Sequence, residues 1–273
     1  MKWLKRIGIT VLALVVLAYG AVCAYFYFNQ RSLQYSVPDR IVPLTETTLT
    51  AAAEVQIPTA DGTPLMAWYE APQPGKPLIL YYRGNSGSFT REHARYEAFV
   101  QDGYGFVAFD YRGFPGSPGE ITQAHVLEDS LAAFDWAKAK GFPMVVWGRS
   151  LGSASAVYTM GQREADALWL ETPFLNFAKI GADHYPYLPV GLLLLDQYPE
   201  EQWIKGVTEP VFVAHGTGDK TIPVYQGQAL YDLVSNKAGI WIEPGADHDD
   251  LWKAGEWDKA RAFFEAAEAE AGR

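Results

Sequence analysis

The pentapeptide Gly-Arg-Ser-Leu-Gly at residues 148–152 is the strongest candidate for chemistry in this 273-residue chain. It directly follows an apolar run at residues 144–147 and precedes a helix-like stretch at 153–160. A serine on a tight strand-to-helix turn, with glycines that let neighbouring backbone pass closely, is typical of a nucleophile elbow. A purely structural glycine-rich turn is the alternative, but the strand-turn-helix context favours Ser150 as a nucleophile.

A serine hydroxyl is a poor nucleophile until a base takes its proton, and that base needs an acid to orient it. His248 follows the apolar run 239–243, and Asp219 follows the run 211–214. We therefore predict His248 as the base and Asp219 as the acid, with Asp196 as a rival acid. The acidic residues beside His248 also suggest a metal site, but consecutive carboxylates rarely converge on one ion.

The elements that must position these residues alternate along the chain between apolar runs and amphipathic, helix-like segments. Two short alternating runs separated by Asp-Gly, at 53–57 and 65–70, predict a hairpin. The apolar runs predict strands at residues 77–82, 105–110, 144–147, 167–171, 211–214 and 239–243. This pattern favours a three-layer α/β fold with a mostly parallel eight-stranded sheet and its chemistry at the carboxyl ends of the strands.

The N-terminal segment, residues 1–28, has the pattern of a membrane anchor. Residues 7–28 carry no charged side chain and follow Lys2, Lys5 and Arg6. As a helix this run is about 33 Å long, enough to cross a bilayer. The cations predict a cytoplasmic N-terminus, with the remainder on the periplasmic or lumenal side, in a bacterium at the inner membrane. A cleaved signal peptide is the alternative, but its apolar core is shorter and ends in small residues.

The remaining chain divides into a polar stalk at residues 29–52 and a catalytic domain at 53–273. Within the domain, residues 172–207 are too long for an ordinary connection and are rich in Leu, Tyr and Pro. Such an insertion is typical of a lid or binding loop. We expect it to line a pocket for an apolar group, with candidate substrate contacts at Phe174, His184 and Tyr185.

Composition excludes several functions. The chain has 22 basic and 32 acidic residues, and three of the basic ones lie at the start of the anchor, so the domain is acidic and repels nucleic acid. The single cysteine, Cys23, excludes an intrachain disulfide and paired-cysteine zinc or redox sites. We expect no metal and no organic cofactor. The pattern makes no prediction of oligomeric state.

From residue 53 onward the chain resembles the α/β-hydrolases, in particular their membrane-anchored serine hydrolase branch. That branch includes esterases, lysophospholipases, monoacylglycerol lipases and depalmitoylases. Five motifs in family order carry the resemblance, at residues 82–87, 110–119, 148–152, 215–219 and 244–248. It implies that Ser150 is the nucleophile, Asp219 the acid and His248 the base, the same three residues that spacing alone indicates.

An oxyanion hole requires two backbone N–H groups aimed at the developing negative charge. Leu151, directly after the nucleophile, is expected to supply one, and the resemblance implies that Asn85 supplies the other. The family usually has His-Gly-Asn where this chain has Arg-Gly-Asn at residues 83–85. Arg83 either steadies this loop or binds an anionic group of the substrate.

These observations predict a membrane-anchored serine hydrolase that cleaves carboxylic esters or thioesters of lipophilic molecules through an acyl-enzyme on Ser150. Its expected partners are a small-molecule or lipid ester and the membrane itself. Two alternatives remain. One is an aminopeptidase-type serine peptidase of the same fold, and the other is a non-catalytic scaffold tethered to the membrane.

Overall fold

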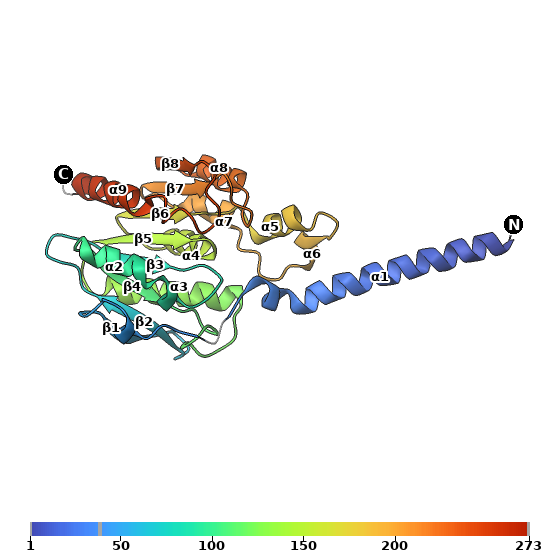
Figure 1. Cartoon of the computed structure of the whole chain (residues 1–273), viewed down its shortest axis with the longest axis horizontal. Coiled ribbons are helices and arrows are strands. Elements are labelled where there is room, and N and C mark those ends of the chain that lie inside the picture. The colour runs from blue at the N-terminus through green and yellow to red at the C-terminus, as the bar shows by residue number, and fades with distance from the viewer. Residues whose placement is uncertain (1, 38–39, 272–273) are drawn as a thin grey trace.

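A computed structural model of the chain describes residues 2–37 and 40–271 (Figure 1). Met1, residues 38–39 of the expected stalk and residues 272–273 lie outside the described part. The elements in chain order, with η for 3-10 helices, are α1 (Lys2–Gln34), η1 (Leu44–Glu46), β1 (Ala53–Pro58), β2 (Pro64–Glu70), β3 (Leu78–Tyr82), η2 (Phe89–Glu92), α2 (His93–Gln101), β4 (Gly105–Phe109), α3 (Gln123–Lys138), β5 (Met144–Arg149), α4 (Leu151–Met160), β6 (Ala167–Glu171), α5 (Phe177–His184), α6 (Val190–Leu193), α7 (Glu200–Trp203), η3 (Ile204–Gly206), β7 (Val211–Gly216), α8 (Val224–Leu233), β8 (Lys237–Glu243) and α9 (Glu256–Ala271).

The strands form one eight-stranded sheet in the order β1-β2-β4-β3-β5-β6-β7-β8. The β1–β2 and β2–β4 pairs are antiparallel, and every other pair is parallel. The mostly parallel sheet predicted from the apolar runs is therefore confirmed. Because parallel strands end at the same edge, the loops that follow β3, β5, β7 and β8 gather there.

The strands are apolar on both faces because helices cover both faces of the sheet. In β3 the side chains of Leu78, Leu80 and Tyr82 pack into one core with α3, α4 and α8. Those of Ile79 and Tyr81 pack into a second core with α2 and α9. This alternation follows from the two-residue period of a strand, and it fixes the sheet as the middle of three layers.

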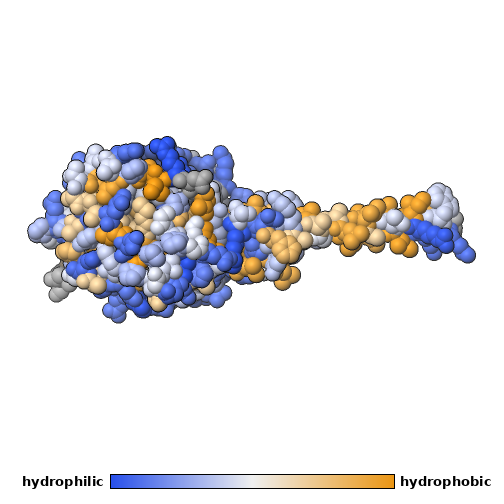
Figure 2. All heavy atoms as spheres, turned by 90° about the horizontal axis from the view of Figure 1, so that it is seen from below, coloured by the Kyte–Doolittle hydropathy of each residue, from blue (hydrophilic) through white to orange (hydrophobic). Residues whose placement is uncertain are grey.

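Helix α1 leaves the body as a long rod (Figure 1), and its shaft is apolar along most of its length (Figure 2). The helix is long and apolar enough to cross a membrane, and none of its most apolar stretch is buried against the rest of the protein. It does not end at residue 28 but continues to Gln34, because its last turns pack on the domain. Tyr35 then enters the core, where its ring lies 6.5 Å from that of Phe114.

The expected insertion at residues 172–207 has two structurally different parts. Helix α7 packs on α4 and belongs to the body of the domain. Helices α5 and α6 project from the sheet edge toward α1 (Figure 1). The sequence pattern led us to expect a lid over the whole of residues 172–207, whereas within this stretch only residues of the projecting part line the cavity.

Candidate active site

Ser150, His248 and Asp219 meet at the carboxyl edge of the sheet, each in the loop after a different strand. His248 Nε2 lies 3.1 Å from Ser150 Oγ, and His248 Nδ1 lies 2.8 Å from Asp219 Oδ2. In a neutral imidazole, Nδ1–H donates to the carboxylate and leaves the Nε2 lone pair facing the serine hydroxyl. This is the geometry of an activated serine nucleophile.

Asp219 is held as a charged acceptor. Its Oδ1 accepts hydrogen bonds from the backbone N–H groups of Thr221 at 2.9 Å and Ile222 at 2.8 Å. Burial alone would raise the pKa of Asp219, but the interactions with His215 and His248 hold that pKa well below its usual value. His215 Nε2 lies 3.3 Å from Asp219 Oδ2 and donates to the carbonyl of Ile222 at 2.9 Å. The second histidine therefore supports the acid without facing the serine.

The turn around Ser150 is strained and closely packed. Ser150 has φ 52° and ψ −121°, a conformation that costs about 1–3 kcal/mol in a residue other than glycine. A Cβ at Gly152 would stand 2.0 Å from the carbonyl oxygen of Tyr82, and one at Gly148 would stand 2.6 Å from that of Gly152. Both glycines are required because backbone passes where any side chain would begin.

The buried carboxyl group of Glu200 contacts this turn through the Ser153 hydroxyl. Ser153 Oγ donates to the Ser150 carbonyl at 2.7 Å, so its single proton is used there. Ser153 Oγ also lies 2.8 Å from Glu200 Oε2, so this hydroxyl bridges the serine turn and the buried carboxyl group. Burial raises the pKa of Glu200 well above its usual value, which agrees with a neutral carboxyl group. Sequence reasoning did not identify this residue.

The two N–H groups expected to form an oxyanion hole lie on either side of Ser150. Leu151 is the first residue of α4, where backbone N–H groups have no partner within the helix. The loop after β3 runs beside the serine, since a Cβ at Gly84 would lie 3.5 Å from Ser150 Cβ. Asn85 follows in that loop and lines the same cavity as Ser150. Their roles remain predictions.

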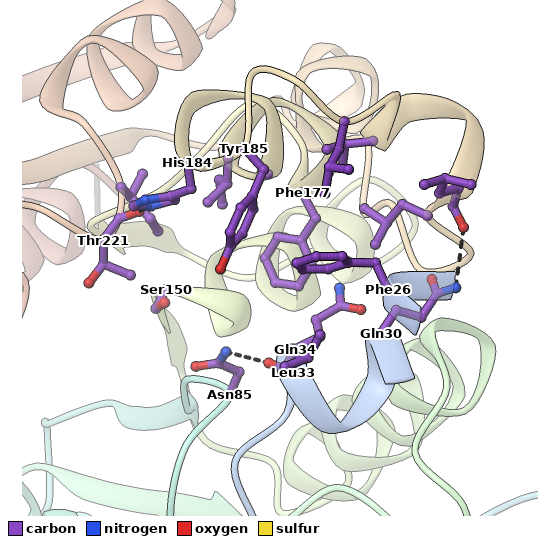
Figure 3. A pocket seen from close by; sticks show the side chains of 17 residues that line it. Phe26, Gln30, Leu33, Gln34, Asn85, Ser150, Phe177, His184, Tyr185 and Thr221 are labelled. Carbon is purple, nitrogen blue, oxygen red and sulfur yellow. Dashed lines mark hydrogen bonds between the residues drawn. The ribbon is translucent and has the colours of Figure 1, made fainter. Parts of the chain in front are cut away.

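The Asn85 loop is tied to the end of α1. The Asn85 side-chain amide donates to the carbonyl of Gln34 at 2.6 Å (Figure 3). The backbone carbonyl of Asn85 accepts from Ser36 N at 3.0 Å, and Gly87 N donates back to the Ser36 carbonyl at 3.0 Å. The position of this loop therefore depends on where α1 docks.

A cavity of about 280 Å³ opens above Ser150, between α1 and the α5–α6 segment (Figure 3). The insertion contributes an apolar wall that includes the expected His184 and Tyr185. Helix α1 forms the opposite wall, which sequence reasoning missed, with Phe26, Gln30, Leu33 and Gln34. The described lining holds no acidic side chain. The spacing of Gln30 and Gln34, one turn apart just after the apolar run, is the signal that indicates a docked helix end.

Comparisons with known proteins place the chain among hydrolases, although no protein-family model matches it. An uncharacterised protein of Mycobacterium tuberculosis is 33% identical over 254 residues, 90% of this chain and 90% of that protein. Rat lysophosphatidylserine lipase ABHD12 is 32% identical over 191 residues, 62% of this chain and 48% of the lipase. A Pyrococcus furiosus esterase structure has a TM-score of 0.68 at 18% identity, covering 86% of this chain and 98% of the esterase.

The chain belongs to the α/β-hydrolase superfamily. An acetyl xylan esterase from Paenibacillus agrees, with a TM-score of 0.63 at 18% identity over 89% of this chain and 93% of that one. The hydrolase fold expected from the five motifs is thereby confirmed. Sequence similarity to a lipase of this superfamily supports an enzyme of the α/β-hydrolase type.

In this α/β-hydrolase, the Arg83 side chain is buried and does not line the pocket, so of the two roles that the sequence left open the structure contradicts the substrate contact and favours the structural one. Its side chain is fully buried and lies 3.2 Å from Asp110. It donates to the carbonyls of Ser86 and Gly87, both at 2.5 Å, and stacks over the Phe114 ring at 4.3 Å. Arg83 thus holds the loop that leads to Asn85 in place from its buried side.

Phe174 is also not a pocket residue of the hydrolase. It is completely buried in the core, and its ring packs 4.7 Å from that of Phe177. Phe177 lies on the cavity wall in its place. The insertion pattern marked the correct segment, but only packing separates the side chain that faces the core from the one that faces the cavity.

Asp196, the rival acid, does not pair with His248 but bonds Gln123 and Arg31. It is buried, accepts from Gln123 N at 3.0 Å and lies 3.2 Å from Arg31 Nε. Arg31 also pairs with Glu120 at 2.6 Å. Asp196 therefore fastens α1 to the hydrolase domain, and Asp219 is the carboxylate that contacts the histidine.

Arg149, the variable residue of the pentapeptide, joins the two halves of the site. Its guanidinium lies 3.1 Å from Glu171 and also pairs with Asp249, the neighbour of His248. The side chain therefore braces the serine turn against the histidine loop of the hydrolase. The sequence pattern gave no indication of this, because the pentapeptide allows any residue at the second position.

Proposed function

We propose that this protein is a serine hydrolase that cleaves carboxylic esters or thioesters of lipophilic molecules, held at a membrane by α1. The observation that carries the proposal is the continuous contact from Asp219 through His248 to Ser150 at the base of an apolar cavity. Sequence similarity to a lipase and structural similarity to esterases support an ester substrate.

In the first half of the reaction, Ser150 Oγ attacks the carbonyl carbon of the ester while His248 Nε2 takes the hydroxyl proton. Asp219 stabilises the imidazolium that forms. The negative charge that develops on the carbonyl oxygen is held by the N–H groups of Leu151 and Asn85. His248 then gives its proton to the leaving alcohol or thiol, which departs and leaves an acyl group on Ser150.

In the second half, water replaces the leaving group. His248 takes a proton from that water, and the resulting hydroxide attacks the acyl carbonyl. Collapse of the second tetrahedral intermediate breaks the bond to Ser150 Oγ, which recovers its proton from His248. The products are a carboxylic acid and the free serine, and no metal or organic cofactor takes part.

The membrane is the second element of the proposal. If α1 spans the bilayer with Lys2, Lys5 and Arg6 on the cytoplasmic side, the domain lies on the opposite side, periplasmic in a bacterium. The apolar cavity walls favour a substrate with an acyl chain or another apolar group.

A fluorophosphonate probe and a panel of p-nitrophenyl esters of rising chain length test the proposal on the full chain in detergent. The wild type should label and turn over the esters, and Ser150→Ala should do neither while keeping its circular dichroism spectrum. Ester turnover that persists in Ser150→Ala would overturn the assignment.

The same experiment separates the two alternatives. Turnover of aminoacyl p-nitroanilides with no turnover of the esters would indicate a peptidase. The described lining argues against one, because a substrate ammonium group would require an acidic partner in the cavity. A folded wild-type protein that neither labels nor turns over any substrate would indicate a scaffold.

A further inference from the structure

The tip of the insertion, residues 185–195 (the lid tip), runs alongside the apolar part of α1. Tyr19 Oη donates to the backbone carbonyl of Tyr187 at 2.9 Å. The Phe26 ring lies 5.2 Å from that of Tyr185. Gln30 bonds both the Leu193 carbonyl, at 3.2 Å, and Leu195 N, at 2.7 Å. The lid tip is therefore fixed to α1 in a defined register.

That register places the lid tip beside the part of α1 that would lie within the hydrocarbon core of a bilayer. The apolar run of α1 ends at Phe28, and Tyr19 lies nine residues before it. At 1.5 Å per residue, Tyr19 is about 13 Å inside the end of the run. If α1 crosses the hydrocarbon core, which is about 30 Å thick, its partner Tyr187 cannot remain in water.

The lid tip is apolar in composition, and most of its backbone N–H groups are hydrogen-bonded, which hydrocarbon favours. Its eleven residues carry no charged side chain. The exposed fractions of Tyr187, Leu192 and Leu195 are 65%, 88% and 54%. Its two prolines have no N–H, and the N–H groups of Leu188, Val190 and residues 192–194 bond carbonyls within the segment. Backbone groups satisfied in this way do not oppose transfer into lipid.

The charged groups nearby mark where the hydrocarbon ends. Arg31 lies one turn beyond Phe28 and pairs with Glu120 and Asp196. Asn85 is bonded to Gln34 one turn further on. The cavity thus extends from the level of Phe26, within the leaflet, to the level of Gln34, in the headgroup region, where it reaches Ser150 (Figure 3).

We propose that the lid tip is embedded in the leaflet on the domain's side and that the cavity opens sideways into that leaflet. The substrate is then a membrane-resident lipid ester. Its acyl chain enters between α1 and the lid tip while its carbonyl stays at headgroup level beside Ser150. A cavity of about 280 Å³, near the lower end of ligand-pocket sizes, suits one acyl chain rather than two. The substrate part of this inference rests on the proposed function, whereas the position of the lid tip does not.

A depth measurement tests the position without any activity. In full-length protein with Cys23→Ser, Tyr187→Cys carries a bimane label in vesicles that contain lipids with a nitroxide on the headgroup or on the acyl chain. Leu233→Cys is the matched control, since α8 ends there at the opposite edge of the sheet, just before β8 begins. We expect acyl-chain nitroxides to quench the Tyr187 label most strongly and to leave the Leu233 label unchanged. Equal, weak quenching of both labels would overturn the proposal.

An activity measurement tests the route of the substrate. In the same vesicles, Tyr187→Asp should reduce hydrolysis of a membrane-resident monoacyl ester by about tenfold or more, because the added charge opposes insertion. It should leave hydrolysis of water-soluble p-nitrophenyl acetate unchanged, and Leu233→Asp should leave both reactions unchanged. Equal loss of both reactions in Tyr187→Asp, or loss of neither, would overturn lateral entry. A wild type silent on both esters would refute the proposed function, while the depth measurement would still decide the position.

Discussion

The guanidinium of Arg83 lies 3.2 Å from the carboxylate of Asp110, and both side chains are fully buried. Burial raises the pKa of Asp110 to about 6, with Arg83 and the Ser88 hydroxyl opposing the rise. This pair fixes the loop that leads to Asn85. Of the two roles that the sequence left open for Arg83, the buried ion pair favours the one that maintains the shape of this loop.

Arg83→Met should therefore destabilise the protein by about 3–5 kcal/mol at pH 8, the typical effect of leaving one partner of a buried pair uncompensated. The effect should be smaller near pH 5. The folded-state pKa of Asp110 lies above its unfolded value of about 3.9. The contribution of protonated Asp110 to the free energy of unfolding is therefore complete below pH 4 and is lost as pH rises through 6. Without Arg83 that pKa rises further, and the loss extends to higher pH.

Thermal unfolding in detergent at pH 5 and pH 8 measures the Arg83 effect. Arg163→Met is the control, because Arg163 forms an exposed pair with Asp135 at 2.7 Å, and its removal should cost no more than about 1 kcal/mol. If Arg83→Met lost the same stability at pH 5 and pH 8, the Arg83–Asp110 pair would not titrate as inferred.

Asp219→Asn should reduce kcat by about 10⁴-fold, the effect seen when a triad histidine loses its orienting carboxylate. Fluorophosphonate labelling should slow in parallel. Asp196→Asn should lower the thermal stability of the docked helix and affect kcat far less, because its partners are Arg31 and Gln123. Steady-state kinetics on one p-nitrophenyl ester checks both variants, and comparable kcat losses would contradict the assignment of Asp219.

Gly152→Ala should prevent folding or abolish labelling, because its Cβ would stand 2.0 Å from the Tyr82 carbonyl oxygen, a backbone atom that cannot move away alone. Gly161→Ala is the matched control at the other end of α4, where a Cβ meets nothing closer than 3.5 Å. Expression yield and circular dichroism distinguish the two variants. Normal folding of Gly152→Ala would mean that β3 and α4 do not pack as closely as described.

Glu256→Gln should flatten the dependence of stability on pH. Burial and the neighbouring Glu171 raise the pKa of Glu256 to about 8, against the opposing effect of Arg95. Because the folded value exceeds the unfolded value of about 4.3, wild-type stability should fall as pH rises through 8. Glutamine keeps an acceptor for Trp169 Nε1, which now donates to Glu256 at 3.0 Å. Melting temperatures from pH 5 to 9 measure how stability depends on pH. Glu265→Gln, at an exposed site, is the control and should keep the wild-type dependence.

Local patterns predicted the sheet and placed the candidate serine, histidine and aspartate after its strands. Apolar runs located the strands to within a few residues, since strands buried on both faces must be apolar throughout. Ser150, Asp219 and His248 follow three strands of that sheet. Their convergence is a consequence of parallel strands ending at a common edge, so strand order together with residue type was sufficient.

What the sequence by itself determined is therefore the fold, the identity of the candidate serine, histidine and aspartate, and an apolar N-terminal helix. Only the tertiary structure decided that Arg83 and Phe174 face the core and that the end of α1 forms a wall of the cavity. The contact between Gln30 and Leu193 joins residues 163 positions apart. Such docking depends on the shapes of two distant surfaces, so the spacing of Gln30 and Gln34 points to a docked helix end but does not say where it docks.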